Sequence, residues 1–291
     1  MTQNSPTAIY VTKGDGSREE FVPDKLLKSL VKAGANPTTA EKITNDVIAG
    51  IAKESLTQHT TNDIYKEAFR HLKERSHAAA ARYSLRRSLM EFGPTGFPFE
   101  AYIAEIFKTE GYQTLVGQVV FGGCVPHEID VVAYNKEKLV MAEVKYHNEP
   151  SGKTDLKVAL YVKARYDDLK TNIYDYGMPP GETRKLDEGW LITNTKFTET
   201  AITYGNCAGI KMMGWDYPKE GNLQQLIEKA HLHPITCLVS LSTAEKMELL
   251  NHRIVLCKTV YEDQALLKTL GFSEVKIVKI LEEINDIMKY N

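Results

Sequence analysis

The chain has 291 residues, 43% hydrophobic and 25% charged, with a formal net charge of -2 at pH 7. This length predicts two or three domains, and the ordinary composition indicates a folded globular protein. A global basic field is excluded, so any nucleic acid would have to be bound by a local basic surface. The four cysteines form no CxxC pair, which argues against a zinc site or a disulfide framework. No apolar stretch could span a bilayer, so we expect a cytoplasmic protein without a membrane partner.

The first elements along the chain are a small hairpin and a series of helices. Residues 9–21 have a strand-turn-strand pattern around Gly14-Asp15-Gly16-Ser17. Asp24 is predicted to cap a helix that begins at Lys25. Further helices are expected over about 38–54, 61–75 and 77–92. Lysines beside a glycine turn and a helix N-terminus suit a phosphate group, although a solvated surface turn would show the same residues.

A longer pattern in this region carries a resemblance to a known family. Its residues are Val11-x-Lys13-x-Asp15-Gly16-x-x-Glu19-x-Phe21-x-x-x-Lys25-Leu26, then Thr61-x-Asp63-Ile64 and Arg82-Tyr83. The pattern, over about residues 8–93, resembles the ATP-cone, a nucleotide-binding regulatory module known from ribonucleotide reductases and their repressor. The resemblance implies ATP or dATP as the ligand, with Lys13, Lys25 and Thr61 contacting the phosphates and Glu19 nearby. Gly14 stands where the family usually has arginine, which removes one cation from that site.

A second region begins after Gly93-Pro94-Thr95-Gly96, which ends a basic, alanine-rich helix. Apolar residues at helical spacing predict a helix from Phe97 that stops at Gly111. The elements expected next are a strand over 112–116, a hairpin, a helix over 154–169, a strand over 189–194, a short helix from Thr198 and a strand over 210–215. Tyr161 falls among the apolar positions of the 154–169 helix. This order predicts an α/β sheet covered on both faces.

The hairpin brings two carboxylates together. If Asn135 to Lys138 form the turn, Tyr134 faces Leu139, and counting back places Asp130 opposite Glu143. Carboxylates opposed at roughly 5 Å repel, so a divalent cation between them is the natural resolution.

Glu143 and Lys145 share one face of their strand, because side chains alternate along it. Taken alone, however, Asp130, Glu143 and Lys145 could equally be an exposed strand face with a salt bridge.

These residues also carry a second resemblance. Ile129-Asp130 followed by Ala142-Glu143-Val144-Lys145-Tyr146, after a helix that carries a glutamate, is similar to the PD-(D/E)xK nuclease superfamily and closest to its Mrr-like restriction endonucleases. The similarity covers about residues 97–218 and implies a restriction-endonuclease-like fold with a mixed central sheet. It implies a Mg²⁺- or Mn²⁺-dependent endodeoxyribonuclease that binds DNA. Asp130, Glu143 and the backbone carbonyl of Val144 would hold the metal, and Lys145 would stabilise the transition-state charge.

Members of this superfamily often add a glutamate from the first helix. Glu100 lies roughly 90° from the centre of the apolar stripe and Glu105 roughly 130°, so Glu100 is the predicted third carboxylate. A carboxylate favoured by the helix dipole is the alternative reading for Glu100. Two departures from the family are His127-Glu128, in place of glycines before Asp130, and a long insert over 174–187. Lys163 and Arg165, on the next helix, are candidate contacts to the scissile strand, although helices commonly carry such charges.

The last section, about 236–291, is expected to be helical. A helix, the Leu270-Gly271 turn and a second helix capped by Ser273 resemble a helix-hairpin-helix unit; a plain helical cap or a dimerisation element is the alternative. Glu282 and Glu283 are expected to repel DNA at this position.

The sequence therefore predicts three domains. They are a mainly α ATP-cone with a β-hairpin over 8–93, an α/β nuclease domain over 97–232 and a small helical domain over 236–291. The predicted function is a metal-dependent DNA endonuclease regulated by ATP or dATP. The alternatives are a nucleotide-sensing, DNA-binding scaffold with an inactive nuclease fold, and a DNA repair or junction nuclease. We expect a homodimer or a higher homo-oligomer.

Overall fold

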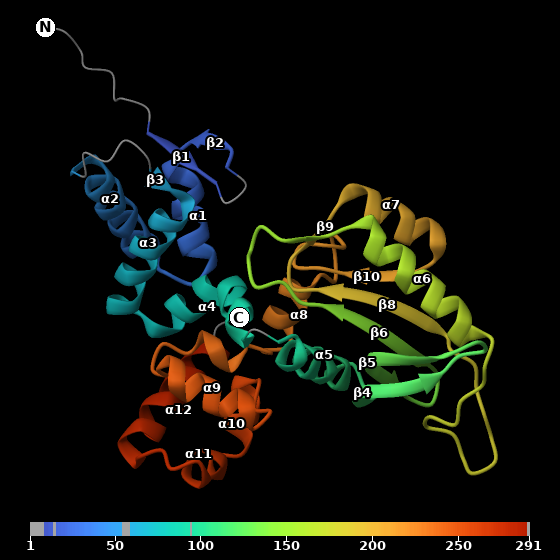
Figure 1. Ribbon diagram of the computed structural model, residues 1–291. Coiled ribbons are helices and arrows are strands. Elements are labelled where there is room, and N and C mark those ends of the chain that lie inside the picture. Colours follow the sequence, from blue (N-terminus) through green and yellow to red (C-terminus); the bar gives the residue numbers. More distant parts are fainter. Residues whose placement is uncertain (1–8, 14–15, 54–58, 94, 290–291) are drawn as a thin grey trace, which may run out of the picture. The chain divides into compact units, whose positions relative to one another are not determined.

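The structure is a computed structural model that describes residues 9–13, 16–53, 59–93 and 95–289. The chain forms two compact units (Figure 1). The first unit takes the chain up to Leu85 together with residues 237–242 and 264–291, and the second takes residues 86–236 and 243–263. The protein is therefore multidomain, and its C-terminal helical region contributes to both units. None of the helices in the described ranges is long and apolar enough to cross a membrane.

A three-stranded sheet and three helices open the first unit. Its strand order is β2 (Arg18–Glu20), β1 (Tyr10–Thr12), β3 (His59–Thr60), with β1 antiparallel to β2 and parallel to β3. The helices are α1 (Pro23–Lys32), α2 (Pro37–Lys53) and α3 (Thr61–Arg75). They bury an apolar core that includes Leu30, Ile43 and Leu72. The predicted hairpin and helices are confirmed, while Gly14, Asp15 and Pro94 lie outside the described residues.

The start of α1 differs from the prediction. The helix begins at Pro23 with Val22 as its N-cap, so Asp24 lies in the first turn instead of capping it. Proline suits that first position because its missing N–H needs no partner there. The Asp24 carboxylate instead pairs with Lys28, at 2.6 Å.

Two C-terminal helices, α11 (Ala265–Thr269) and α12 (Glu274–Met288), complete the first unit. Gly271 adopts φ +81° in the turn between them, and Ser273 caps α12 as predicted. The expectation that Glu283 would be a repelling surface charge is wrong, because its side chain is buried. Its carboxylate accepts the backbone amides of Val239 at 2.7 Å and Ser240 at 2.8 Å.

The second unit is built on a five-stranded mixed sheet. Its strand order is β10 (Lys211–Met213), β8 (Glu188–Thr193), β6 (Leu139–Lys145), β5 (Pro126–Tyr134), β4 (Gln113–Phe121). The pairs β4–β5 and β5–β6 are antiparallel, whereas β6–β8 and β8–β10 are parallel. The strand expected over 112–116 runs from Gln113 to Phe121, because β5 pairs with it on both sides of Gly117.

Helices α5 (Phe97–Thr109) and α6 (Leu156–Lys170) cover opposite faces of this sheet (Figure 1). A Cβ added at Gly189 would lie 2.5 Å from the Tyr166 ring of α6, while the next residue, Trp190, packs edge-on against Phe107 of α5. Neighbouring residues of a strand point to opposite faces, so the two helices are separated by the sheet. The predicted cover on both faces is confirmed.

Shorter elements complete the chain. They are α4 (His77–Ser88) with a 3-10 turn (Leu89–Phe92), β7 (Lys153–Thr154), β9 (Lys196–Phe197), α7 (Glu199–Ala208), α8 (Leu223–Lys229), a 3-10 turn (Ile235–Cys237), α9 (Thr243–Asn251) and α10 (Cys257–Glu262). In the insert over 174–187, Tyr174 and Arg184 form an isolated antiparallel bridge. The Arg184 guanidinium donates to the carbonyl of Asn135 at 2.6 Å, so the insert closes over the end of the β5–β6 hairpin.

Candidate functional site

The β5–β6 hairpin has the register that the sequence predicts. Asn135 N–H donates to the Lys138 carbonyl at 3.0 Å, and the Asn135 side-chain oxygen accepts the amides of Glu137 and Lys138. Tyr134 pairs with Leu139, as counted from the turn, and the pairing continues to Val131 and Ala142. The same register places the next residues, Asp130 and Glu143, beside each other where the ladder ends.

At Asp130 the pairing of β5 is interrupted with both of its neighbouring strands, β4 and β6. The β4–β5 pairing includes Val116↔Val131 and Gln118↔Ile129 but skips Gly117 and Asp130, which the register places opposite each other. Gly117 has φ +64°, a conformation that glycine adopts without strain. On the β6 side, Oδ2 of Asp130 accepts the backbone N–H of Val144 at 2.6 Å. A side chain therefore replaces the main-chain hydrogen bond that would have continued the hairpin.

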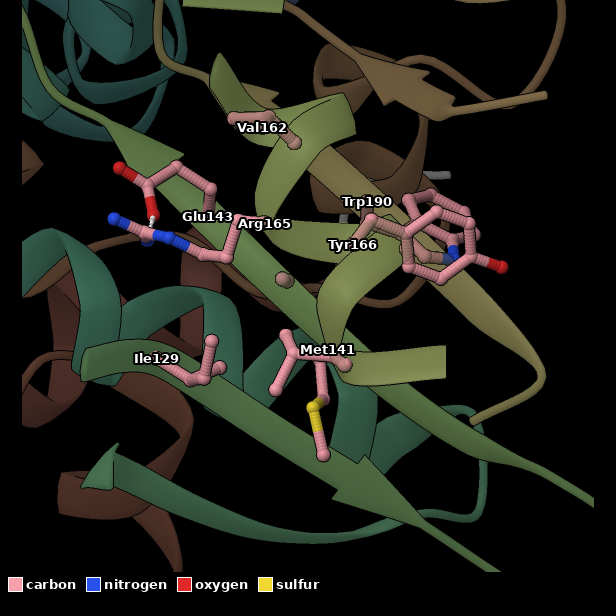
Figure 2. Close-up of a pocket in the computed structure, with 10 residues that line it drawn as sticks. Ile129, Met141, Glu143, Val162, Arg165, Tyr166 and Trp190 are labelled. Carbon is pink, nitrogen blue, oxygen red and sulfur yellow. Dashed lines mark hydrogen bonds and ion pairs between the residues drawn. The ribbon is translucent and has the colours of Figure 1, made fainter. Parts of the chain in front are cut away.

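The Glu143 carboxylate is held by two side chains of α6. Tyr161 donates its hydroxyl to Oε1 at 2.6 Å. Arg165 forms an ion pair with Oε2, which Figure 2 shows. Arg165 also donates to the carbonyl of Glu128 at 3.1 Å, and its guanidinium lies 5.5 Å from the centre of the Tyr161 ring. Tyr161 was expected among the apolar positions of this helix, which is wrong: its hydroxyl contacts Glu143.

Two carboxylates of the site, Asp130 and Glu100, have raised pKa values. Burial, followed by the charge of Glu143, raises the pKa of Asp130 to about 7, although the Val144 amide opposes the rise. Burial also raises the pKa of Glu100 on α5, with Glu128 and Glu143 adding to the rise. Like charges in a partly buried site disfavour ionisation, so this cluster has a deficit of positive charge that Arg165 offsets only in part.

Helix α5 carries both candidate glutamates, Glu100 and Glu105, and β6 carries Lys145. Glu105 pairs with Lys108 at 2.6 Å on the outer side of α5 and is absent from the groups that perturb Asp130, whereas Glu100 is among them. Lys145 is the exposed last residue of β6, two positions after Glu143 and on the same face. The structure thus brings Asp130, Glu143 and Glu100 into one neighbourhood, with Lys145 at its edge.

His147 follows the site strand and is fixed by other contacts. Its Nε2 lies 2.9 Å from Oγ1 of Thr154, and its backbone N–H donates to Oδ1 of Asn194 at 2.9 Å. Burial, then the charge of Lys145, lowers the pKa of His147. The lowered pKa favours the neutral ring, and these contacts hold His147 in place beside Lys145.

The donor atoms suit a hard divalent cation, because carboxylate and carbonyl oxygens are the ligands of Mg²⁺ and Mn²⁺. As the side chains stand, no three His, Cys, Asp or Glu residues among those described converge closely enough to hold a metal ion. Glu143 is engaged by Arg165, while Asp130 uses only Oδ2 in a hydrogen bond to Val144. The chemistry of the donor set therefore fits such a cation, and binding would require Glu143 to exchange partners.

A cavity of about 20 Å³ lies between the sheet and α6 behind this ion pair (Figure 2). Glu143 and Arg165 line its polar end, and the rest of its lining is mainly apolar, including Ile129, Met141 and Val162. This volume holds about one water molecule. The cavity is too small for a nucleotide, so a ligand of Glu143 or Arg165 would approach from the outer surface.

A separate polar cluster fastens the β4–β5 turn to α6. Asp168 accepts from His127 Nε2 at 2.7 Å and from the Cys124 amide at 2.7 Å. The His127 bond is the main cause that lowers the pKa of Asp168 to about 2, and Asp168 in turn raises the pKa of the Cys124 thiol. A Cβ at Gly122 would lie 2.2 Å from this carboxylate, so glycine allows the turn to close over it. His127, noted as a departure from the family pattern, has this anchoring contact.

In the first unit, the predicted phosphate-contacting residues come from adjoining elements. Lys13 and Lys25 both pair with Glu19, at 2.7 Å and 3.6 Å, and Lys13 is the main cause that lowers the pKa of Glu19. The parallel pairing of Thr12 with Thr60 puts the next residues, Lys13 and Thr61, at the same end of β1 and β3. Thr61 is the first residue of α3, whose amides face outward at that end.

The protein thus combines an N-terminal module of a small sheet and helices, which has candidate phosphate-contacting lysines, with a mixed α/β domain and a helical C-terminal region. Residues 9–91 match the family model described as "ATP cone domain", and residues 233–288 match "AF1548-like, C-terminal". An uncharacterized protein of Archaeoglobus fulgidus is 33% identical over 187 residues, which are 64% of this chain and 99% of that protein. The crystal structure of the protein of unknown function AF1548 is 32% identical, with a TM-score of 0.54, and spans 67% of this chain and 98% of that one. The chain belongs to the AF1548-like family.

Two further similarities are more limited. The transcriptional repressor NrdR of Microcystis aeruginosa is 32% identical over 80 residues, which are 26% of this chain and 47% of the repressor. The MspJI restriction endonuclease, in complex with a 27-mer oligonucleotide, is 12% identical with a TM-score of 0.33, covering 60% of this chain and 36% of that one. A likeness this weak carries no argument. The predicted ATP-cone is thus confirmed, and the PD-(D/E)xK assignment stays a prediction.

Proposed function

We propose that this protein is a metal-dependent DNA endonuclease whose activity is regulated by ATP or dATP bound to the ATP-cone. The observation that carries the proposal is the pair Asp130 and Glu143, adjacent where the hairpin ladder opens, with Lys145 two residues further on. The charge of Glu143 contributes to the raised pKa of Asp130, and a cation at this site would stabilise the ionised form of Asp130.

In the proposed reaction water attacks the phosphorus of a DNA phosphodiester and the P–O bond to the leaving strand breaks. A Mg²⁺ ion held by Asp130, Glu143 and the carbonyl of Val144 would supply Lewis-acid catalysis. The Lys145 ammonium stabilises the negative charge that develops on the phosphoryl oxygens. Burial raises the pKa of Glu100, which favours a role for this carboxyl in accepting the proton of the attacking water or returning it to the leaving oxygen.

The proposed regulation has a structural route through the end of the cone segment. Met90 lies within the residues that match the ATP-cone model and also within the second unit. Its carbonyl accepts the Tyr146 hydroxyl at 2.7 Å, and its sulfur lies 3.1 Å from the Asn194 amide nitrogen. Tyr146 directly follows Lys145, so a displacement of Met90 on nucleotide binding would reach the site strand.

Cleavage of supercoiled plasmid DNA with Mg²⁺, in the presence and absence of ATP and dATP, tests the proposal. We expect Asp130→Ala and Lys145→Ala to abolish nicking and Glu100→Ala to reduce it strongly. Glu105→Ala is the matched control on the same helix and is expected to cleave normally, because Glu105 pairs with Lys108 away from the site. Activity that survives both Asp130→Ala and Lys145→Ala would remove the site assignment.

The second candidate function is a nucleotide-sensing, DNA-binding scaffold. The ion pair between Glu143 and Arg165 favours it, since the arginine already engages one of the two carboxylates that a cation would need. Calorimetric titration with Mn²⁺ separates the two: binding abolished by Glu143→Ala supports the nuclease, and no binding to the wild type supports the scaffold. A repair or junction nuclease would use the same residues, and branched DNA substrates would distinguish it. The proposed homo-oligomer can be tested by light scattering.

A further inference from the structure

The Arg165 guanidinium makes three contacts at the mouth of the candidate site. It forms an ion pair with Glu143, donates to the carbonyl of Glu128 and lies over the Tyr161 ring. The Arg165 side chain is 26% exposed and that of Glu143 is 14% exposed, so the pair stands at the surface of the unit. An arginine in this position is reachable by a ligand from solvent.

Two of these contacts are made to groups other than Glu143. The Glu128 carbonyl belongs to β5, and the Tyr161 ring lies one helical turn before Arg165 on α6. If Glu143 turns toward a cation, Arg165 remains held by the carbonyl and by the aromatic ring. Nη1 of Arg165 makes both the Glu128 and the Glu143 contacts, so release of Glu143 frees a charged donor for an incoming anion.

We propose that Arg165 is a phosphodiester-binding residue of this site and that Glu143 is its partner until a divalent cation binds. The inference rests on the proposed nuclease function and names a residue that contacts the substrate. The cation and Arg165 compete for Glu143, and the DNA phosphate takes the place of Glu143 on the guanidinium. Cation binding and DNA binding are thereby linked through one carboxylate.

Lys163 of the same helix does not fit this role. Its ammonium pairs with the Asp167 carboxylate, one turn along α6, and its side chain is 24% exposed. Lys163 thus resembles Arg165 in charge and exposure but contacts no carboxylate of the site. Substitution of Lys163 is a matched control for charge removal on α6.

The test measures two affinities of the full-length protein. Calorimetry gives Mn²⁺ binding without DNA, and fluorescence anisotropy gives binding of a labelled mixed-sequence DNA duplex in Ca²⁺. We expect Arg165→Met to tighten Mn²⁺ binding and to weaken DNA binding. Each affinity should change by about tenfold, which corresponds to about 1.4 kcal/mol of binding free energy. Arg165→Lys keeps the charge, so we expect this variant to bind Mn²⁺ as the wild type does and to retain most of the DNA affinity. Lys163→Met is expected to leave Mn²⁺ affinity unchanged and DNA affinity within about twofold.

The opposite signs of the two changes distinguish this role from structural damage. If Arg165→Met weakens both affinities or leaves both unchanged, Arg165 only supports Glu143 and the inference is overturned. A thermal melt of each variant checks that it is folded, and Arg165→Gln, which also removes the charge, provides the same comparison if Arg165→Met is unfolded. Failure of the wild type to bind Mn²⁺ would instead count against the proposed nuclease function itself.

Discussion

The backbone N–H of Val144 donates to Oδ2 of Asp130 at 2.6 Å, at the point where the β5–β6 ladder stops. This bond ties the first carboxylate of the candidate site to the strand that carries the second. It favours the ionised form of Asp130, yet burial and the neighbouring Glu143 outweigh it and raise the pKa of Asp130 to about 7. The contact thus fixes the position of the carboxylate without removing its electrostatic cost.

Asp130→Asn is expected to stabilise the metal-free protein above neutral pH. Asp130 has a folded-state pKa raised to about 7 from the ordinary 3.8, so the stability it contributes is complete below about pH 4 and is lost as the pH rises through 7. Asparagine can still accept the Val144 amide and does not ionise. At pH 8 in EDTA, urea unfolding should show a gain of roughly 2–4 kcal/mol over the wild type. The gain should disappear at pH 4; an equal gain at both pH values would show that ionisation of Asp130 is not its cause.

Asp168→Asn is expected to make the Cys124 thiol more reactive. Asp168 raises the pKa of Cys124 by a hydrogen bond and by its negative charge, and the thiolate is the form that is alkylated. Mass spectrometry after timed iodoacetamide treatment at pH 8 measures the rate. The exposed Cys207 serves as the internal standard, because it lies on α7 away from this carboxylate. A ratio of Cys124 to Cys207 labelling that does not rise would contradict the assigned contact.

The same cluster should affect stability in the acidic range. His127 lowers the pKa of Asp168 to about 2, so the stability from this carboxylate is present above its ordinary pKa of 3.8 and is lost as the pH falls through 2. We expect His127→Ala to lower the melting temperature at pH 6 and the difference from wild type to narrow between pH 4 and 2. A difference that stays constant over this range would point to lost packing instead of the ion pair.

Tyr146→Phe is expected to weaken the response to nucleotide. The substitution removes only the hydroxyl that donates to the Met90 carbonyl, at a cost of about 1 kcal/mol in the free energy of unfolding. Under the proposed regulation, the ratio of cleavage rates with and without ATP should move toward one, while ATP affinity stays that of the wild type. Nucleotide titration and plasmid cleavage measure the two quantities. An unchanged ratio would exclude this hydrogen bond as the route.

Lys13→Ala is expected to lower ATP affinity by about tenfold, because hydrogen bonds between charged groups are the strong ones. Lys13 lies at the common end of β1 and β3 beside Glu19 and close to Thr61 in the strand register. Lys28→Ala is the matched control, since Lys28 pairs with Asp24 on an exposed face of α1. Equal losses in both variants would indicate a general effect of charge instead of a phosphate contact.

Much of the candidate site follows from local sequence. The turn at Asn135 fixes the hairpin register through hydrogen bonds within four residues, so the neighbouring positions of Asp130 and Glu143 could be counted. Strand alternation then places Lys145 beside Glu143. The glutamate on α5 followed from the angle around a helix axis. Each of these relations depends on residues close in the chain or in direct strand pairing.

The burial of Glu283 also has a signal in the sequence. Glu283 lies on the same helical stripe as Ile280 and Ile287, three and four residues away, and this spacing predicts a buried position. Its charge led to the expectation of a surface role, but two backbone amides satisfy the carboxylate. A carboxylate on an apolar stripe indicates a buried hydrogen-bond acceptor that needs donors from elsewhere in the chain.

By itself the sequence determined the order of the elements, the hairpin register and the ATP-cone, because these depend on periodicity, turn residues and short spacings. Only the tertiary structure decided that Arg165 and Tyr161 meet Glu143, and that residues 237–242 and 264–291 join the first unit. Arg165 and Tyr161 meet Glu143 because of the way that α6 packs on the sheet. That packing is the sum of many weak apolar contacts between distant residues, and no local pattern specifies it.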